Sequence, residues 1–348
     1  LQADSAEQFW FRTGNVLVDD EAKLKNIAES HQYPADFIRL IKRDDAKQLA
    51  GIELNRDALL FVNAGWVKVK QLCDVIKRKC GARLDYVQAN VSDISSINGK
   101  WKIAGENNDT IMMTDCVVAA NGSLARRFSV LDWLPLDAVR GQLTNIEQTH
   151  KSRHIKCGIS GDRYITPAHE GRHILGASYN MNDDSLDLSS CDQEQNISRI
   201  NRLISAEFEQ QSERTGRVAF RAVSQDRVPL VGCVPDKDKF ELDYQDLHHG
   251  RHSRLYPAGT YMPGLYISTA HGSRGLASCF ISAEIIASMI CAEPAPVEKD
   301  IADYLNPARF IIRRLKPVSY THLTLPTKES RGGGGGGGGG GVGGGGGG

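Results

Sequence analysis

The sequence predicts a mixed α/β (α+β) protein in which an incomplete Rossmann-like domain is interleaved with a second domain built on a mixed, mainly antiparallel sheet. Three observations predict this fold. Residues 264–290 read as an apolar strand, a glycine-rich turn and an apolar helix, which is a nucleotide-site pattern. Residues 115–122 form a second apolar run that ends in a glycine turn. Residues 140–146 and 172–179 alternate apolar and polar side chains, as half-buried strands do.

Composition restricts the class of protein. The 348 residues carry 42 basic and 42 acidic side chains, and 41% are apolar, so a soluble globular protein without a global basic field is expected. The eight cysteines form neither a CxxC pair nor a Cys/His cluster, which argues against a metal site and a disulfide scaffold. Because no run of 18 apolar residues occurs, we expect no membrane partner and a cytoplasmic location.

The two ends of the sequence differ from its body. Residues 332–348 contain 16 of the 35 glycines, and residues 318–327 resemble a sequencing adapter translated in one reading frame. We therefore expect residues 318–348 to take no part in folding, although a flexible glycine linker is an alternative. Leu1 stands where a start Met is expected, which suggests a further segment upstream.

The first half of the body predicts helices followed by strands. Apolar spacing and a first-turn proline predict helices over residues 20–31, 34–41 and 43–50. A fourth helix contains Leu72, Cys73, Ile76 and Cys80 and ends at Gly81, a residue typical of left-handed caps. The expected strands that follow are residues 84–91, a hairpin of 100–104 with 110–114, and the buried run 115–122.

The second half predicts the antiparallel sheet and then the nucleotide-type unit. A helix over residues 193–209 should pack on the strands of 140–179. Residues 264–270, 271–275 and 276–290 are the strand, turn and helix of the last unit, and their glycines could equally serve tight packing alone. Two strand ends that converge on one crevice are what a dinucleotide needs. No GxGxxG occurs before the glycine tail, so a self-sufficient Rossmann site is not expected.

Five motifs, taken in order, resemble one family of flavoproteins. They are VRGQ at 139–142, GDRYITP at 161–167, LGASY at 175–179, FRAVSQDRVPLVG at 220–232 and AHGSRGL at 270–276. The series is similar to the D-amino-acid and glycine oxidase family and, within it, to the FAD-dependent C-terminal module of the bifunctional tRNA 5-methylaminomethyl-2-thiouridine biosynthesis proteins. The resemblance covers residues 1 to about 316.

The resemblance implies a division of the chain. Residues 1–60 would be a helical part of the substrate or cap region, 61–132 the second segment of the FAD-binding domain, 133–225 the substrate domain, 226–316 the C-terminal FAD-binding segment, and 317–348 a tail that is not a domain. The GxGxxG strand and helix that hold the FAD pyrophosphate would precede Leu1.

The implied activity is the FAD-dependent oxidation of 5-carboxymethylaminomethyl-2-thiouridine at the tRNA wobble position. The carboxymethyl group would leave as glyoxylate, and the base would become 5-aminomethyl-2-thiouridine. S-adenosylmethionine would act only through a separate methyltransferase domain of the whole protein. The alternatives are an oxidase of glycine, sarcosine or another small amine, and an inactive fragment or binding module.

The resemblance also implies site residues. Arg221 would face the substrate carboxylate, Tyr164 and Tyr179 would line the amine pocket, and Arg140 would help to close it. The positions expected to contact FAD are Gly272, Ser273, Arg274, Gly275 and Leu276 at the flavin, Asn90 and Val91 at the adenine, and Ala120, Asn121 and Gly122 at the pyrophosphate.

Other polar residues have more ordinary explanations. His271 could act as a base, but a lone histidine beside a glycine turn is more often structural. Three basic clusters, residues 77–79, 150–156 and 309–316, could meet tRNA phosphates, although each fits a solvated face better. The expected tRNA partner therefore rests on the resemblance.

Overall fold

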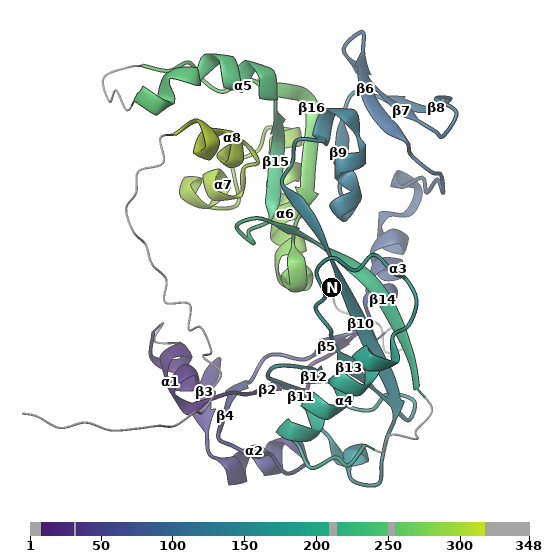
Figure 1. The fold of residues 1–348 in the computed structure, drawn as a ribbon, viewed down its shortest axis with the longest axis vertical. Helices are drawn as coiled ribbons and strands as arrows, with labels where there is room; N and C mark the ends of the chain where they lie inside the picture. The colour runs from purple at the N-terminus through teal and green to yellow at the C-terminus, as the bar shows by residue number, and fades with distance from the viewer. Residues whose placement is uncertain (1–7, 31–32, 209–213, 250–254, 317–348) are drawn as a thin grey trace, which may run out of the picture.

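A computed structural model describes residues 8–30, 33–208, 214–249 and 255–316. The predictions for residues 317–348 lie outside the described residues. Most of the described chain is organised around an eight-stranded sheet and a three-stranded sheet. In Figure 1 the eight-stranded sheet lies in the lower part of the view and the three-stranded sheet in the upper part. Two long strands of the large sheet, β10 (Leu136–Glu147) and β14 (Arg214–Ser224), run between these two parts.

The large sheet is mainly antiparallel and has the order β14-β10-β13-β12-β11-β2-β4-β3. Its other strands are β13 (Arg172–Gly176), β12 (Tyr164–Ile165), β11 (Gly158–Ser160), β2 (Asn15–Val18), β4 (Ala58–Phe61) and β3 (Ile38–Ile41). Helix α4 (Ser190–Leu203) packs on β10 and β13, as predicted for a helix in this region. A buried core of Val16, Leu60, Ile159 and Ile200 joins the sheet to this helix.

The first 60 residues contribute three strands to this sheet, besides helices α1 (Glu21–Glu29) and α2 (Arg43–Ala50). The helix predicted over 34–41 is wrong: after a turn at Pro34, the chain forms β3, which pairs with β4. Ile38 and Ile41 are the buried ends of this strand, and Leu40, which with Phe37 and Ile41 suggested a helix, is exposed. Pairing with β4 therefore outweighs the local helical pattern.

The smaller sheet has the order β15-β16-β9, with strands Leu230–Pro235, Tyr261–Thr269 and Val117–Ala119. β9 and β16 run parallel, so the predicted convergence of the two strand ends is confirmed. Helix α6 (Gly275–Cys291) follows β16 and packs on the sheet through Ile285 and Ile286. The helices α5 (Lys237–Asp243), α7 (Lys299–Leu305) and α8 (Ala308–Leu315) complete this part.

In Figure 1, α3 (Val69–Cys80) lies on the right between the two parts, and a small antiparallel sheet lies at the upper right, beside β9. That sheet contains β6 (Asp93–Ile97), β7 (Lys100–Ala104) and β8 (Thr110–Thr114), so the predicted hairpin is confirmed. A two-stranded sheet pairs β1 (Trp10–Phe11) with β5 (Trp66–Val67). Residues 84–91, predicted as a strand, are irregular, because no described strand lies alongside to share backbone hydrogen bonds with them.

Within the described residues, one helical stretch, Gly272–Cys291, is long and apolar enough to cross a membrane by length and composition. Helices that cover the sheet of a soluble α/β protein meet the same test, and α6 lies against β15 and β16. No group of three or more His, Cys, Asp or Glu side chains in the described ranges could hold a metal ion.

Candidate active site

A cavity of about 620 Å³ lies over the β10–β14 pair, where the large sheet meets the turn before α6. Arg221 of β14, Tyr164 of β12 and Tyr179 just beyond β13 contribute to its wall. Gly272 and Ser273, in the 3₁₀ turn η7 (Gly272–Arg274), face the same cavity. The structure thus brings three predicted substrate residues together with two predicted flavin contacts.

Arg221 is held in place by the backbone around it. Its Nη1 donates a hydrogen bond to the carbonyl oxygen of Ser178, 3.1 Å away, and its guanidinium lies 6.0 Å from the centre of the Tyr179 ring. The guanidinium covers Gly141 so closely that a Cβ there would lie 2.0 Å from Nη1. Since a guanidinium has five N–H donors, this arrangement leaves others available to bind a carboxylate.

The two tyrosines belong to the cavity wall rather than to the core. Tyr164 is 38% exposed and Tyr179 is 44% exposed. The Tyr164 hydroxyl end lies over Gly176, where an added Cβ would be 3.1 Å from Oη. Desolvation raises the pKa of Tyr164, and the nearby charge of Arg221 opposes that rise only in part. Tyr164 therefore offers a neutral hydroxyl at physiological pH.

The turn before α6 fits the anionic edge of a flavin ring. Gly272 has a positive φ of 56°, and Val223 of β14 lies beneath it, so a side chain there would be strained. Residues Arg274, Gly275 and Leu276 continue into the first turn of α6 and do not line the cavity. Because the first N–H groups of a helix lack intrahelical partners, this turn presents donors and a positive dipole end to the cavity.

The second glycine turn lies on the other side of β14. Asn121 and Gly122 follow β9 and Ala120, and they line a separate cavity of about 1130 Å³ together with Phe220. Gly122 approaches Ala222, whereas Gly272 approaches the next residue, Val223. The two turns thus contact opposite faces of the end of β14, and a long cofactor could contact both.

Two predicted adenine contacts lie apart from these cavities. Asn90 and Val91 are exposed in the irregular segment before β6, and neither lines a cavity described above. The side-chain amide of Asn90 donates to Glu106 Oε1 at 2.9 Å. The structure therefore does not bring these two residues together with the flavin turn.

Arg140 also lies away from the cavity. It is 1% exposed, and its Nη1 donates to Asp192 Oδ2 of α4 at 2.5 Å. Burial opposes ionisation of Asp192, but hydrogen bonds from Asn180, Arg140 and Ser178 outweigh it and lower its pKa. Arg140 therefore joins α4 and the 183–187 loop to β10, instead of closing the pocket as the resemblance implied.

His271 is structural in this arrangement. Its Nδ1 lies 2.8 Å from Ser278 Oγ and its Nε2 lies 3.1 Å from Ser268 Oγ, so both ring nitrogens have partners. Burial lowers its pKa, which favours the neutral ring. The histidine thus ties β16 to α6 and is poorly placed to accept a substrate proton.

A comparison with known protein families decides the class. The model of the family described as FAD dependent oxidoreductase matches residues 1–289. The chain belongs to this family of FAD-dependent oxidoreductases. FAD is therefore its cofactor, and the glycine turns that meet at β14 are the residues of this chain that fit it.

Several curated relatives of this oxidoreductase share the same name. The tRNA 5-methylaminomethyl-2-thiouridine biosynthesis bifunctional protein MnmC of Stutzerimonas stutzeri is 28% identical over 317 residues, which is 88% of this chain and 48% of that protein. The protein of the same name from Chromobacterium violaceum is 33% identical over 309 residues, 85% of this chain and 46% of its own length. The chain spans about half the length of the curated relatives it matches.

Solved structures agree on the fold of the oxidoreductase. Glycine oxidase from Geobacillus kaustophilus matches 86% of this chain and 75% of its own with a TM-score of 0.67 and 15% identity. L-proline dehydrogenase from P. horikoshii matches 90% of this chain and 80% of its own with a TM-score of 0.67 and 16% identity. At such low identity the likeness concerns the fold alone.

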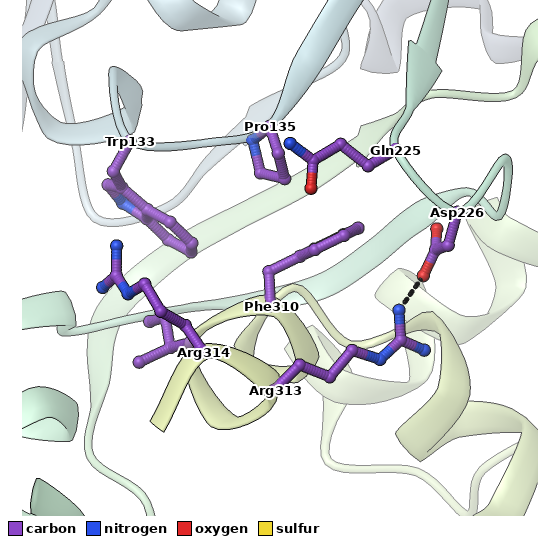
Figure 2. Close-up of a pocket in the computed structure, with 8 residues that line it drawn as sticks. Trp133, Pro135, Gln225, Asp226, Phe310, Arg313 and Arg314 are labelled. Atoms are coloured by element: carbon purple, nitrogen blue, oxygen red, sulfur yellow. Dashed lines mark hydrogen bonds and ion pairs between the residues drawn. The ribbon is translucent and has the colours of Figure 1, made fainter. Parts of the chain in front are cut away.

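The basic cluster at 309–316 is largely occupied by ion pairs. Arg309 binds Asp226 through two hydrogen bonds of 2.9 and 3.0 Å. Figure 2 shows that Arg313 binds the same carboxylate. Arg314 pairs with Glu241. Arg313 and Arg314 border a hollow beside Phe310, but the charges of all three arginines chiefly hold α8 in place.

Sequence reasoning missed two arginines of the oxidoreductase cavity, Arg163 and Arg217. Arg217 precedes Arg221 by four residues, so both point to the same face of β14. That period of two was visible in the sequence. Arg163 stands in the quoted GDRYITP motif beside Tyr164, but only the position of β12 next to β13 brings it to the cavity.

Proposed function

We propose that this FAD-dependent oxidoreductase oxidises the secondary amine of 5-carboxymethylaminomethyl-2-thiouridine at the wobble position of tRNA. The products would be 5-aminomethyl-2-thiouridine and glyoxylate. The observation that carries the proposal is the position of Arg221, opposite the Gly272–Ser273 turn in a single cavity. The names of the curated relatives support a modified tRNA as substrate.

Each group in the cavity has a role in this reaction. Arg221 binds the carboxylate and so directs the adjacent methylene toward the turn, while Tyr164 and Tyr179 flank the amine. When bound, FAD supplies the acceptor for the two electrons of the carbon–hydrogen bond. Water then adds to the resulting C=N carbon, the C–N bond breaks, and the amine nitrogen stays with the base. Glyoxylate carries away the oxidised carbon and the carboxylate.

The reaction needs a neutral amine rather than a strong protein base. This requirement suits a cavity in which Tyr164 stays protonated and His271 is engaged by two serines. The positive charge of Arg221 lies nearby and favours the uncharged form of the amine. Binding and orientation are thus the main contributions of the chain.

We further propose that the second activity of the bifunctional relatives, a methyltransferase that uses S-adenosylmethionine, lies in the half of their length that this chain does not match. A cytoplasmic location follows from a tRNA substrate. The proposed methyltransferase is tested by expressing the whole polypeptide and assaying oxidation and methylation on the same tRNA.

Rapid mixing of the flavin-loaded whole polypeptide with modified anticodon stem-loop RNA tests the oxidation. We expect bleaching of the flavin absorbance and release of one glyoxylate per modified base. Glycine and sarcosine should reduce the flavin far more slowly. Faster reduction by free glycine than by the RNA would instead assign the chain to the small-amine oxidases. No reduction by any of the three substrates would favour an inactive chain.

A further inference from the structure

The cavity holds more positive charge than one carboxylate requires. Its lining contains three arginines, Arg163, Arg217 and Arg221, against one aspartate, Asp162. Asp162 is itself engaged by Arg199 of α4, which adds a further cation beside the wall. Asp162 is the ion-pair partner of both Arg163 and Arg199, so one carboxylate faces two cations there. If Arg221 binds the substrate carboxylate, the cavity still has an excess of positive charge, to which Arg217 contributes.

Arg217 is free to bind a ligand. It is exposed, and among the described residues its guanidinium has no hydrogen-bond or ion-pair partner. It lies on the same face of β14 as Ala219 and Arg221, with the small side chain of Ala219 between them. This differs from the basic cluster on α8, where Asp226 and Glu241 already occupy the guanidinium groups.

Arg163 is a second cation of the cavity wall, and it forms an ion pair with Asp162. Its Nε donates to Asn196 Oδ1 at 3.0 Å, and its Nη1 donates to the carbonyl oxygen of Asp162 at 3.0 Å. The side chain is 11% exposed, and desolvation together with the charge of Arg199 lowers its pKa. A guanidinium that is held in place and partly desolvated binds an anion more strongly than one on an open surface.

The geometry points to a second anion on the substrate. We propose that Arg217 binds a backbone phosphodiester of the RNA next to the modified nucleoside, in a cavity whose wall also contains Arg163, while Arg221 binds the carboxylate. The proposal rests on the function proposed above and adds the feature that would select a nucleotide over a free amine. Phosphate contacts of this kind position a nucleic acid without reading its sequence.

The spacing along β14 supports this division. Four residues of an extended strand span about 13 Å, so the Cα atoms of Arg217 and Arg221 are separated by roughly that distance. A small amino acid such as glycine is much shorter than this span. A nucleotide whose base carries a carboxymethylaminomethyl group has its carboxylate and its phosphate at opposite ends, with the base and ribose between them.

Binding measurements with the flavin-loaded whole polypeptide test the proposal. The ligand is an anticodon stem-loop RNA that carries 5-carboxymethylaminomethyl-2-thiouridine. Arg217→Gln should raise its Kd about tenfold and lower the dependence of log K on log salt by about one unit, the effect of one lost phosphate contact. Arg217→Lys should retain most of the affinity, because a point charge suffices for phosphate.

Arg39→Gln is the matched control. Arg39 is an exposed arginine on β3, the opposite edge strand of the same sheet, and does not line the cavity. It should leave the Kd and the salt dependence unchanged. Thermal unfolding and flavin content should match the wild type in both variants, which separates loss of binding from loss of folding.

A kinetic comparison separates the two proposals. The penalty of Arg217→Gln on kcat/KM should be at least about tenfold larger for the stem-loop than for the isolated modified nucleoside, which has no phosphodiester.

Equal penalties, or an unchanged Kd and salt dependence, would overturn the role of Arg217 while leaving the proposed oxidation intact. If a small amine with two carboxylates shows the Arg217 dependence and the RNA does not, Arg217 binds a second carboxylate and the phosphate proposal fails. If the wild-type protein oxidises small amines but does not oxidise the modified RNA, the proposed function itself is wrong.

Discussion

The guanidinium of Arg221 occupies the space that a side chain at position 141 would need. Gly141 lies on β10 and Arg221 on β14, and the two strands are paired along this stretch. Glycine is therefore needed at position 141 for space and not for a turn, because the absence of a side chain lets the long Arg221 side chain lie flat on the sheet. The position of the Arg221 guanidinium in the cavity thus depends on a residue 80 positions away in the sequence.

Replacing Arg221 by Ala in the whole polypeptide should reduce kcat/KM for the modified RNA. The loss should correspond to about 2 to 5 kcal/mol of transition-state stabilisation, because the carboxylate loses its paired cation. Lys should restore only part of this, since it lacks the planar fork of donors. Flavin content should not change. Rapid-mixing reduction checks the prediction, and unchanged kinetics in the Ala variant would remove Arg221 from the site.

Gly141→Ala should displace the Arg221 guanidinium without unfolding the protein, because the clash falls on the end of a flexible side chain. We expect a loss of about 1 kcal/mol in transition-state stabilisation, which is roughly a fivefold effect on kcat/KM. In an Arg221→Ala background the same substitution should have almost no further effect. Additive losses in this double-mutant cycle would show that Gly141 acts independently of Arg221.

At the scale of elements, α8 is held to the 224–228 turn by one carboxylate. Asp226 accepts hydrogen bonds from Arg309, which is 8% exposed, and from Ser224. Burial opposes its ionisation, but these bonds and the contact with Arg313 outweigh it and hold the pKa of Asp226 well below its ordinary value. The carboxylate is consequently favoured in the folded state.

Asp226→Asn should therefore lower the free energy of unfolding at pH 7 by roughly 3 kcal/mol, because it leaves Arg309 buried without a counter-charge. The folded pKa lies below the unfolded value of about 3.9, so the stabilisation is complete above that pH and is lost as pH falls below it. The gap between variant and wild type should thus shrink from pH 4 downward. Denaturant unfolding at several pH values measures it.

Glu241→Gln is the control for this prediction. Glu241 of α5 pairs with Arg314, which lies on α8 like Arg309, but the side chains of Glu241 and Arg314 are 35% and 60% exposed. The substitution should change stability by no more than about 1 kcal/mol. Equal losses in both variants would mean that burial of Asp226 and Arg309 has no special effect.

The elements that the sequence predicts well are those whose signals are local. The hairpin of β7 and β8, helix α2, and the strand, turn and helix from β16 to α6 each combine an apolar pattern with a glycine or polar boundary. Residues 38–41 and 84–91 fail for a common reason. Whether a short apolar segment becomes a strand depends on a neighbouring strand, and its own sequence does not contain that information.

The same limit applies to the candidate site. Arg221, Tyr164 and Tyr179 follow from motif resemblance, and the structure gathers them in one cavity. Arg140 belongs to one of the same motifs, yet it faces α4 because alternate residues of β10 point to opposite sides of the sheet. Arg217 could have been found from its spacing of four residues to Arg221 on one strand, whereas Arg163 becomes visible only when β12 is placed in the sheet.

At the scale of the whole molecule, one side of the small sheet is uncovered among the described residues. β9 forms its edge, and Val118 of that strand is 41% exposed. Helix α6 leaves Leu276, Phe280, Ile281, Met289 and Ile290 exposed, and the irregular segment after α3 exposes Leu84, Tyr86, Val87 and Val91. Contiguous exposed apolar side chains of this kind mark contact surfaces, so this side is suited to contact further protein.

The chain of 348 residues, expressed alone, should consequently bind FAD weakly. Its glycine turns contact the cofactor from one side, and the GxGxxG unit expected upstream of Leu1 would supply the remaining phosphate contacts. A polypeptide of the relatives' full length should purify yellow with stoichiometric flavin. Flavin absorbance per protein measures both. Stoichiometric flavin in the shorter chain would show that its own residues form the main cofactor site.

The pairing of β14 with β10 has a consequence for how this protein can evolve. Eleven residue pairs fix the register, and alternate residues of β14 face different cavities, with Arg221 on one side and Phe220 on the other. Inserting or deleting a single residue between Arg217 and Arg221 would leave the two arginines on opposite faces of the strand. Length changes in this strand are therefore tolerated only in twos, whereas the loops at either end can lengthen freely.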